Sequence, residues 1–434
     1  MALGGGGFTS FNKILPGTYM NFVSSGSTSA NVSDRGICAV GMELSWGKEG
    51  EFVTVSADQF LTDSVKMFGY TYSASKMRNL RDLFLNASKV HIYRLGEGVK
   101  ATSDLAEAKY SGVCGNNISV KVGKNIDDES CFDVTTFYNG GKKDVQKVKS
   151  AEELNDNDFV TWKKSATLSA GTLLKLTGGA DATVTGEDYQ KFLDCAESVS
   201  FNVLCVASMD ESVNNLVAAY TVRMREERGV KFQSVLYNTA YDSIGVVNVA
   251  TSANALASEK CNLVWFVAGA LAGCEINKSI TNKVYNGSYK VSGSYTQSQL
   301  EEAIREGKFV IHYVDGEYRI LKDINSFVSV TADMGEAFCE NQTVRVLDQI
   351  ANDDAYLFKT KYLGQVPNDE AGRISLWNDI TEHRKTLQKM RAIENFKDTD
   401  VTVEKGNSKT SVVVSGRICP VNAMNYLYIT TEIE

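Results

Sequence analysis

Several features that usually mark a function are scarce or missing in this chain of 434 residues. No run of 18 or more apolar residues occurs, which excludes a membrane-spanning helix. The first ten residues lack the basic and apolar regions of a secretory signal, so we expect the protein to be made in the cytoplasm. The nine cysteines form no Cys-x-x-Cys pair and no even framework, which indicates reduced thiols.

Patterns that carry catalysis or metal binding are also missing. The three histidines, His91, His312 and His383, have no second His or Cys at metal-ligand spacing. There is no Gly-x-Ser-x-Gly nucleophile elbow and no complete phosphate-binding loop. The acidic groups at 127–129 and 353–354 lack the spacing of a cation loop, which favours a turn or a helix start. We therefore expect no catalytic residue, no cofactor and no metal, and so no enzyme.

The overall composition is that of an ordinary globular protein. Apolar residues make up 43% and charged residues 23% of the chain, and its length suggests two to four domains. The 53 acidic and 45 basic residues leave a net charge of −8, which argues against a general nucleic-acid-binding surface. Only three prolines occur, and two of them, Pro16 and Pro420, lie near the chain ends.

The middle of the chain changes its pattern twice. Short β runs separated by turn signals predict a β-sandwich or small barrel over 96–185. Near-continuous apolar runs at 200–208, 229–237 and 244–251 are typical of parallel strands buried on both faces. The helical pattern at 210–229 between the first two runs completes a βαβ unit. Further expected elements are helices at 57–68, 73–87, 262–273, 296–308 and 333–363, strands at 37–44, 52–57 and 89–95, and hairpins at 309–321 and 401–416.

These patterns predict a multi-domain α/β protein. We expect an α/β middle domain, a β-rich insertion before it, an α+β part at the C-terminal end and an extended strand arm at each end. The expected segments are an N-terminal arm (1–25), a small α/β segment (26–95), the β-sandwich insertion (96–185), the α/β domain (186–330), a C-terminal domain (331–418) and a C-terminal arm strand (419–434).

The two arms have the alternating pattern of a single strand without a local partner. In the first, the strand-forming residues are Tyr19, Met20, Phe22 and Val23, and in the second Tyr426, Leu427, Tyr428 and Ile429. An unpaired strand tends to add to an exposed sheet edge. The two ends could pair inside one molecule, or each could add to a sheet of a neighbouring copy and build an interlocked polymer.

A basic helix is expected over 375–396. Its inward stripe is Leu376, Ile380, His383, Leu387 and Met390. Between residues 371 and 397, six basic and three acidic residues leave a charge of +3 within a negative protein. The helix could simply present a solvated face, or it could dock an acidic partner through charge complementarity. The candidate contacts are Arg384, Lys385, Lys389 and Arg391.

Six stretches of the sequence, taken together, resemble the tail sheath family. These are LPGTYMNFVS at the start, IGVVNV after YNTAYDS in the middle, and NDITEHRKTLQKMRAIENF, DVTVEKG, SVVV and PVNAMNYLYIT at the end. The resemblance runs over essentially the whole chain in the same order. It is closest to the short sheath proteins of contractile phage tails and phage-like bacteriocins of Gram-positive bacteria.

The resemblance implies a structural subunit that polymerises as hexameric rings around an inner tail tube and contracts. It implies an inner α+β domain built from both termini and the C-terminal domain 331–418, a subtilisin-like middle domain, an outward-facing β-sandwich and strand-adding arms. The basic helix 375–396 is then our candidate for the surface that faces the tube. Further implied partners are baseplate and tail terminator proteins, with no nucleic acid and no membrane insertion, in a virion tail or a released phage-tail-like particle. The alternatives are the sheath of a non-phage contractile injection system and, from another class, an α/β hydrolase-like enzyme using 186–330.

Overall fold

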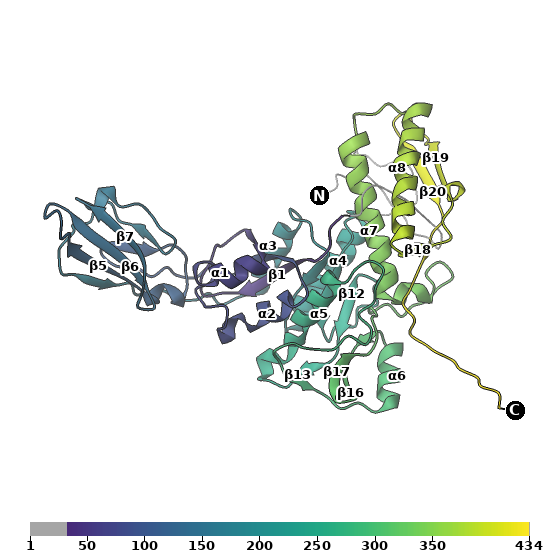
Figure 1. Cartoon of the computed structure of the whole chain (residues 1–434), viewed down its shortest axis with the longest axis horizontal. Coiled ribbons are helices and arrows are strands. Elements are labelled where there is room, and N and C mark those ends of the chain that lie inside the picture. The colour runs from purple at the N-terminus through teal and green to yellow at the C-terminus, as the bar shows by residue number, and fades with distance from the viewer. Residues whose placement is uncertain (1–32, 434) are drawn as a thin grey trace. The chain divides into compact units, whose positions relative to one another are not determined.

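A computed structural model describes residues 33–433 and divides them into two compact units (Figure 1). Unit 1 contains the described residues up to Ala39, the segment Asn79–Lys89 and everything from Glu197 onward. Unit 2 contains Val40–Arg78 and Val90–Ala196. The structure is mixed α/β, as the sequence predicts.

One part of unit 2 is a small α/β layer. Its strands follow the sheet order β1-β3-β2, and α1 begins directly after β2. Ser56 and Gln59 form a capping box at the start of α1, and Gly69, with a φ of 75°, ends it. The elements are β1 (Ile37–Glu43, of which Ile37–Ala39 belong to unit 1), β2 (Phe52–Ser56), α1 (Ala57–Phe68), a 3₁₀ turn (Ser75–Met77), β3 (Lys89–Leu95, of which Lys89 belongs to unit 1) and α3 (Gly186–Ala196); α2 (Arg78–Phe84) belongs to unit 1 except for Arg78.

The other part of unit 2 is all β, which confirms the β-sandwich prediction for this region. Its larger sheet has the antiparallel order β7-β6-β5-β9, and β4 pairs with β8. Asn139 and Gly140, with φ values of 49° and 75°, make the turn between β6 and β7. Trp46, Tyr138 and Phe159 lie in its core. The strands are β4 (Ala106–Ala108), β5 (Ile118–Lys124), β6 (Phe132–Tyr138), β7 (Gly141–Val148), β8 (Val160–Trp162) and β9 (Leu173–Lys175).

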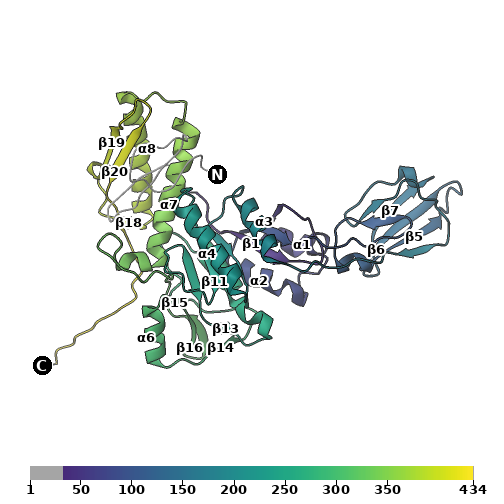
Figure 2. The same cartoon turned by 180° about the vertical axis from the view of Figure 1, so that it is seen from behind.

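The centre of unit 1 is a parallel sheet with the order β15-β12-β11-β10. Every residue of β10 and β12 is buried, which explains the apolar runs in the sequence. The strands are shorter than the runs that predict them. Helix α4 packs on β11 (Figure 2), and α5 packs on β10 and β11. The bounds are β10 (Val203–Cys205), α4 (Glu211–Glu226), β11 (Gln233–Tyr237), β12 (Val246–Val249), α5 (Leu263–Gly273) and β15 (Lys308–Phe309).

Small elements flank this sheet. The predicted hairpin at 309–321 is present, with Asp315 and Gly316 at φ values of 51° and 89° in its turn. The flanking elements are β13 (Ser252–Ala253), β14 (Val291–Ser292), α6 (Gln297–Arg305), β16 (Ile311–Val314) and β17 (Glu317–Ile320).

The rest of unit 1 is built on two long helices, and its hairpin β19–β20 lies against α8 (Figures 1 and 2). The indole nitrogen of Trp377 on α8 donates to the carbonyl oxygen of Val401 at 3.0 Å, which fixes the hairpin to the helix. The elements are α7 (Asn341–Leu357), a π-helical turn (Phe358–Tyr362), α8 (Glu370–Lys389), β18 (Ile393–Glu394), β19 (Val401–Lys405), β20 (Val412–Gly416) and β21 (Cys419–Pro420).

Both long helices differ in their ends from the prediction. The helix expected at 333–363 begins only at Asn341, whose backbone N–H donates to the Asp323 carbonyl oxygen at 3.0 Å. The helix expected at 375–396 begins earlier, because the Asp369 side chain caps it by accepting from the Gly372 N–H. It ends at Lys389 because Arg391 and Asn395 adopt positive φ values of 63° and 58°.

Candidate functional site

The C-terminal arm begins with a short segment that is tied to unit 1. β21 pairs antiparallel with β18, and the Val421 N–H donates to the Ala392 carbonyl oxygen at 2.9 Å. The side-chain amide of Gln342 on α7 then donates to the Val421 carbonyl oxygen at 3.0 Å and accepts from the Ala423 N–H at 2.8 Å. Residues 419–423 are therefore held in place; we call them the C-terminal root.

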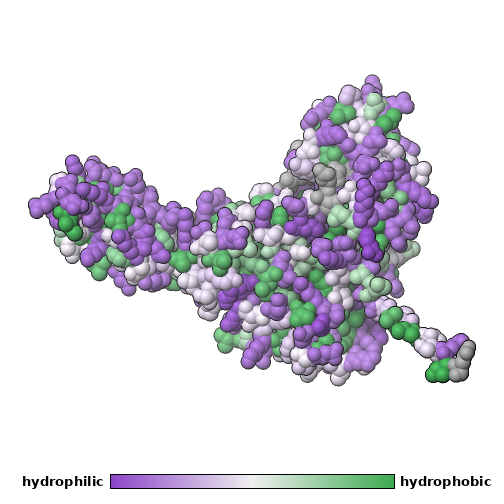
Figure 3. Space-filling view, in the orientation of Figure 1, coloured by the Kyte–Doolittle hydropathy of each residue, from purple (hydrophilic) through white to green (hydrophobic). Residues whose placement is uncertain are grey.

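Beyond this root, residues 424–433 form no helix or strand and extend away from the folded part of unit 1 (Figures 1 and 3). The ammonium of Lys322 lies 5.8 Å from the ring centre of Tyr426. The predicted arm residues are largely in water, with exposed fractions of 66% for Tyr426, 82% for Leu427, 90% for Tyr428 and 75% for Ile429. The single chain therefore does not form the predicted strand, because none of its described segments supplies a partner edge to residues 424–433.

The N-terminal arm residues Tyr19, Met20, Phe22 and Val23 lie outside the described residues. The described chain begins at Ser33, which is tied to the same helix as the C-terminal root. Its hydroxyl donates to Asp353 Oδ1 at 2.5 Å, and Gln349 Nε2 donates to that hydroxyl at 2.7 Å. Gln349 and Asp353 both lie on α7.

One of the four contacts predicted on the basic helix is wrong. Arg384 is 0% exposed, so it does not lie on a docking face. Its guanidinium donates to His383 Nδ1 at 2.8 Å and lies 3.5 Å from Asp354 Oδ2 on α7. His383 Nε2 in turn lies 3.0 Å from Asp353 Oδ2. Because Nδ1 accepts from Arg384, the ring proton is on Nε2, and the histidine links a buried arginine to a buried carboxylate.

The other three predicted contacts differ in exposure. Lys385 is half-buried and bonds to Asp398 at 3.0 Å and to Glu382 at 3.3 Å, and these bonds raise the pKa of its ammonium. Lys389 and Arg391 are exposed. Met390, predicted on the inward stripe, is 38% exposed because the helix ends before it. Leu376, Ile380, His383 and Leu387 are buried as predicted.

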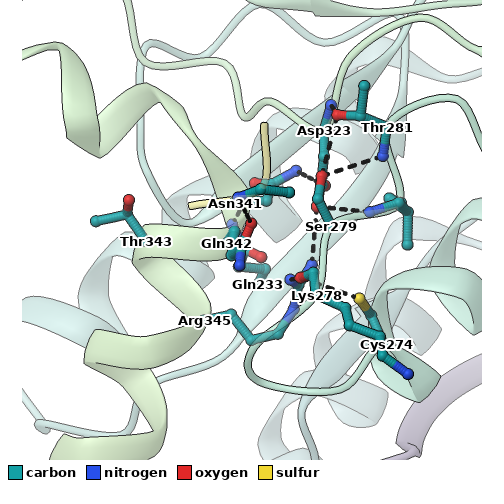
Figure 4. Close-up of polar contacts among 12 residues, drawn as sticks. Gln233, Cys274, Lys278, Ser279, Thr281, Asp323, Asn341, Gln342, Thr343 and Arg345 are labelled. Atoms are coloured by element: carbon teal, nitrogen blue, oxygen red, sulfur yellow. Dashed lines mark hydrogen bonds and ion pairs between the residues drawn. The ribbon is translucent and has the colours of Figure 1, made fainter. Parts of the chain in front are cut away.

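A buried polar network, which the sequence analysis missed, fixes α7 to the α/β part of unit 1 (Figure 4). Its centre is Asp323, which is fully buried and accepts from Arg345 Nη2 at 3.1 Å and Asn341 Nδ2 at 2.9 Å. Asn341 also accepts from Gln233 on β11 at 2.8 Å. A second pair, Arg225 and Asp348, makes two hydrogen bonds of 2.7 Å. Bidentate pairs of this kind hold both position and orientation.

The described residues also bear on the chemistry considered from the sequence. In 33–433, no group of three or more His, Cys, Asp or Glu side chains is arranged to hold a metal ion. The acidic pair at 353–354 lies near the end of α7, not at a helix start, and bonds to Ser33, His383 and Arg384. Among the described helices, none is both long and apolar enough to cross a bilayer.

Comparison with known proteins agrees with this architecture over the whole chain. The 31%-identical protein XkdK of the phage-like element PBSX, from Bacillus subtilis, is matched over all of both chains. The sheath tail protein from Desulfitobacterium hafniense has 31% identity and a TM-score of 0.80, covering 96% of this chain and 100% of that one. The sheath tail protein from Listeria innocua has 32% identity and a TM-score of 0.82, with coverages of 93% and 96%.

The fold extends to more distant proteins. A sheath complex of an extracellular contractile injection system, in its contracted state, shares the fold at 10% identity with a TM-score of 0.57. Family models match in chain order: the tail sheath protein Gp18 domain III N-terminal region (35–95), the phage tail sheath β-sandwich domain (96–181), the central domain (182–326) and the C-terminal domain (333–434). Because four tail sheath models match in chain order and XkdK is 31% identical over all of both chains, the chain belongs to the phage tail sheath family, a family of structural proteins.

Proposed function

We propose that this chain polymerises as stacked hexameric rings around an inner tail tube, and that the resulting sheath contracts to drive the tube through a cell envelope. The observation that carries the proposal is the exposed apolar segment 424–433. Six of its large side chains are between 66% and 100% exposed: Met424, Tyr426, Leu427, Tyr428, Ile429 and Ile433. Leaving so much apolar surface in water is costly, and such a patch marks an interaction site.

In the assembled sheath, this segment adds as a strand to a sheet edge of another copy. Tyr426 to Ile429 has an alternating pattern, and its backbone forms no hydrogen bond with the backbone of any other residue in 33–433; both features suit strand addition. The N-terminal residues Tyr19, Met20, Phe22 and Val23 have the same pattern. Two strand exchanges per subunit would keep neighbouring rings linked while subunits move as rigid bodies.

Deleting residues 424–434 tests this proposal. The deletion begins after Ala423 and leaves the C-terminal root in place, so we expect folded monomers that no longer polymerise. Size-exclusion chromatography and negative-stain microscopy would show hollow cylinders for the full chain and discrete particles for the truncated one. As a matched control, deleting only residues 432–434 keeps Tyr426–Ile429 and should leave assembly intact. Cylinders from the longer deletion would refute the strand exchange.

We also propose that the end of α8 faces the tube, through Lys389 and Arg391. Both are exposed, whereas Lys385 already bonds to acidic neighbours of its own chain. Exposed ion pairs contribute about 0–1 kcal/mol each, but repeated around a ring they can hold firmly and still release together. Baseplate and tail terminator proteins would then contact the two ends of the sheath.

Charge reversal tests the tube contact. Lys389→Glu combined with Arg391→Glu should leave sheath self-assembly intact and abolish co-assembly with the tube protein at low salt. The matched control reverses two exposed charges of the β19–β20 hairpin, Lys405→Glu with Lys409→Glu, and should co-assemble normally. If the first double variant still forms sheathed tubes, Lys389 and Arg391 do not contact the tube and are ordinary solvated residues.

A further inference from the structure

The two ends of the described chain are tied to the same helix. Ser33 bonds to Gln349 and Asp353, and the C-terminal root bonds to Gln342 and Thr343. Gln342 and Gln349 are seven residues apart, which is about 10 Å along a helix. Segments that are more than 380 residues apart in the sequence are thus attached within about three turns of α7, between Gln342 and Asp353.

Gln342 acts on the C-terminal root as a neighbouring strand would. Its side-chain amide donates to the Val421 carbonyl oxygen and accepts from the Ala423 N–H, and these two groups are the ones that a paired strand would satisfy. Gln342 is 2% exposed, so its amide is held in place by the surrounding side chains. Thr343 adds a side-chain hydrogen bond to Asn422, with 3.0 Å between Thr343 Oγ1 and Asn422 Nδ2. Pairing ends at Ala423, and the chain leaves the surface there.

α7 itself is fixed on several sides. Arg345 bonds to Asp323, and Asp348 bonds to Arg225 of α4. Asp353 bonds to His383 of α8. Every one of these six side chains is buried, so the attachments leave little freedom for the helix to shift.

We propose that α7 is the shared anchor of both arms, with Gln342 and Thr343 as the clamp on the C-terminal arm and Gln349 and Asp353 as the N-terminal clamp, which holds Ser33, the described residue that follows the N-terminal arm in the chain. This inference rests on the proposed strand exchange. When a neighbouring subunit pulls on residues 424–433, the clamp passes the tension to α7 and the α/β core. Without the clamp, the pull would peel β21 from β18, which are joined over only two residues each.

Hydrogen exchange of the unassembled full chain measures the C-terminal clamp directly. In the wild type, we expect the Ala423 amide to exchange at least tenfold more slowly than the amides of residues 425–433. Gln342→Leu keeps the side-chain volume but removes both hydrogen bonds, so the Ala423 amide should lose this protection. The Val421 amide, which donates to Ala392, serves as an internal reference and should change less.

The rate at which assembled sheaths lose subunits tests whether the clamp resists the pull of a neighbouring subunit. We expect Gln342→Leu to form cylinders that lose subunits at least tenfold faster than wild type when diluted into mild urea. Gln365→Leu is the matched control, because Gln365 is exposed and its side-chain amide donates to a nearby residue, at the Thr360 carbonyl oxygen, rather than to the C-terminal arm. Ser33→Ala removes the hydroxyl contacts of the N-terminal clamp without changing α7, and combined with Gln342→Leu it should accelerate subunit loss further.

Two results would overturn the shared anchor. One is unchanged protection of Ala423 in Gln342→Leu, and the other is wild-type subunit loss in the double variant. If Gln342→Leu fails to fold, as judged by its melting transition, Thr343→Val tests the same clamp with a smaller change. These outcomes are separate from the arm deletion: assembly without residues 424–434 would refute the strand exchange itself, whereas stable cylinders of the clamp variants would refute only the anchor.

Discussion

Two helices of unit 1, α5 and α7, are both largely buried, but one packs through apolar side chains and the other also through polar ones. α5 is apolar around its whole circumference, and its residues 263–272 are all buried. α7 has 14 buried residues, and seven of them are polar or charged. Apolar burial is non-directional, so α5 contributes stability without selecting partners. The polar side chains of α7 each bond to a particular segment, so this helix determines where those segments lie.

The two helices also approach their neighbours differently. Gly269 and Gly273 let α5 lie directly on the backbone of residues 83–86, where a Cβ would collide with carbonyl oxygens. α7 instead reaches its neighbours through long side chains such as Arg345 and Gln342. The comparison teaches that α5 depends on shape and α7 on satisfied hydrogen bonds, so different substitutions should damage them.

The largest expected effect is on α7. Arg345→Met leaves Asp323 buried without its charged partner, and we expect the free energy of unfolding to fall by about 3–5 kcal/mol. Urea denaturation measures the change. Adding Asp323→Asn removes the orphaned charge and still offers an oxygen that can accept from Asn341, so the double variant should be more stable than Arg345→Met alone. A loss below about 1 kcal/mol in the single variant would mean that the ion pair does not hold α7.

A second effect concerns the positive charge of the buried Lys231 side chain, which lowers the free energy of unfolding. Lys231 is bonded to Asn352 of α7 through its backbone, and burial, with Arg225 nearby, lowers the pKa of its ammonium to about 8. Between pH 8 and 10.5 the unfolded chain binds more protons at this site than the folded one, so its contribution to stability increases as pH rises. We expect a gain of at most about 3 kcal/mol across this window.

Lys231→Met supplies the comparison for that measurement. Because the variant cannot titrate at this position, the stability difference between wild type and variant should grow in favour of wild type from pH 8 to 10.5. Subtracting the two urea-denaturation series cancels the titration of other groups. A difference that stays constant with pH would show that the Lys231 ammonium is not destabilised in the folded state.

The smallest effect is on α5. Gly269→Ala places a methyl group against the Leu83 carbonyl and should reduce stability by about 1–3 kcal/mol, despite the better helix propensity of alanine. The control is Gly186→Ala at the start of α3, where no atom lies within 4 Å of the added Cβ. Thermal melts should show a lower midpoint for the first variant and an equal or higher one for the second. Equal midpoints for both would mean that α5 has room to move.

Much of the fold can be predicted from the sequence because its signals are local. Buried parallel strands are apolar along their length, and the Asp315-Gly316 turn specifies its hairpin. The end of α8 is harder to predict, because Arg391 and Asn395 adopt left-handed φ values that neither residue type requires. The contacts of Gln342 with residues 421 and 423 have no sequence signal, since they join segments about 80 residues apart.

Arg384 shows where the prediction of the basic helix failed. It is four residues after Ile380 and three before Leu387, so helical periodicity places it within the buried stripe. A base at such a position signals a buried ion pair, and its carboxylate partner Asp354 comes from another helix that periodicity cannot identify. Counting charge over the whole helix obscured this position, whereas Lys389 and Arg391 lie on the exposed end.

The fixed root also determines how often the free segment meets a neighbour. Ten residues, 424–433, extend from a point held by α7. A flexible chain of this length has a root-mean-square reach of about 17 Å. Confined to that volume, the arm presents itself to an adjacent sheet edge at an effective concentration in the millimolar range or above. An intrinsically weak strand pairing would therefore be nearly saturated inside a stacked ring, while dilute subunits with the same arm remain apart.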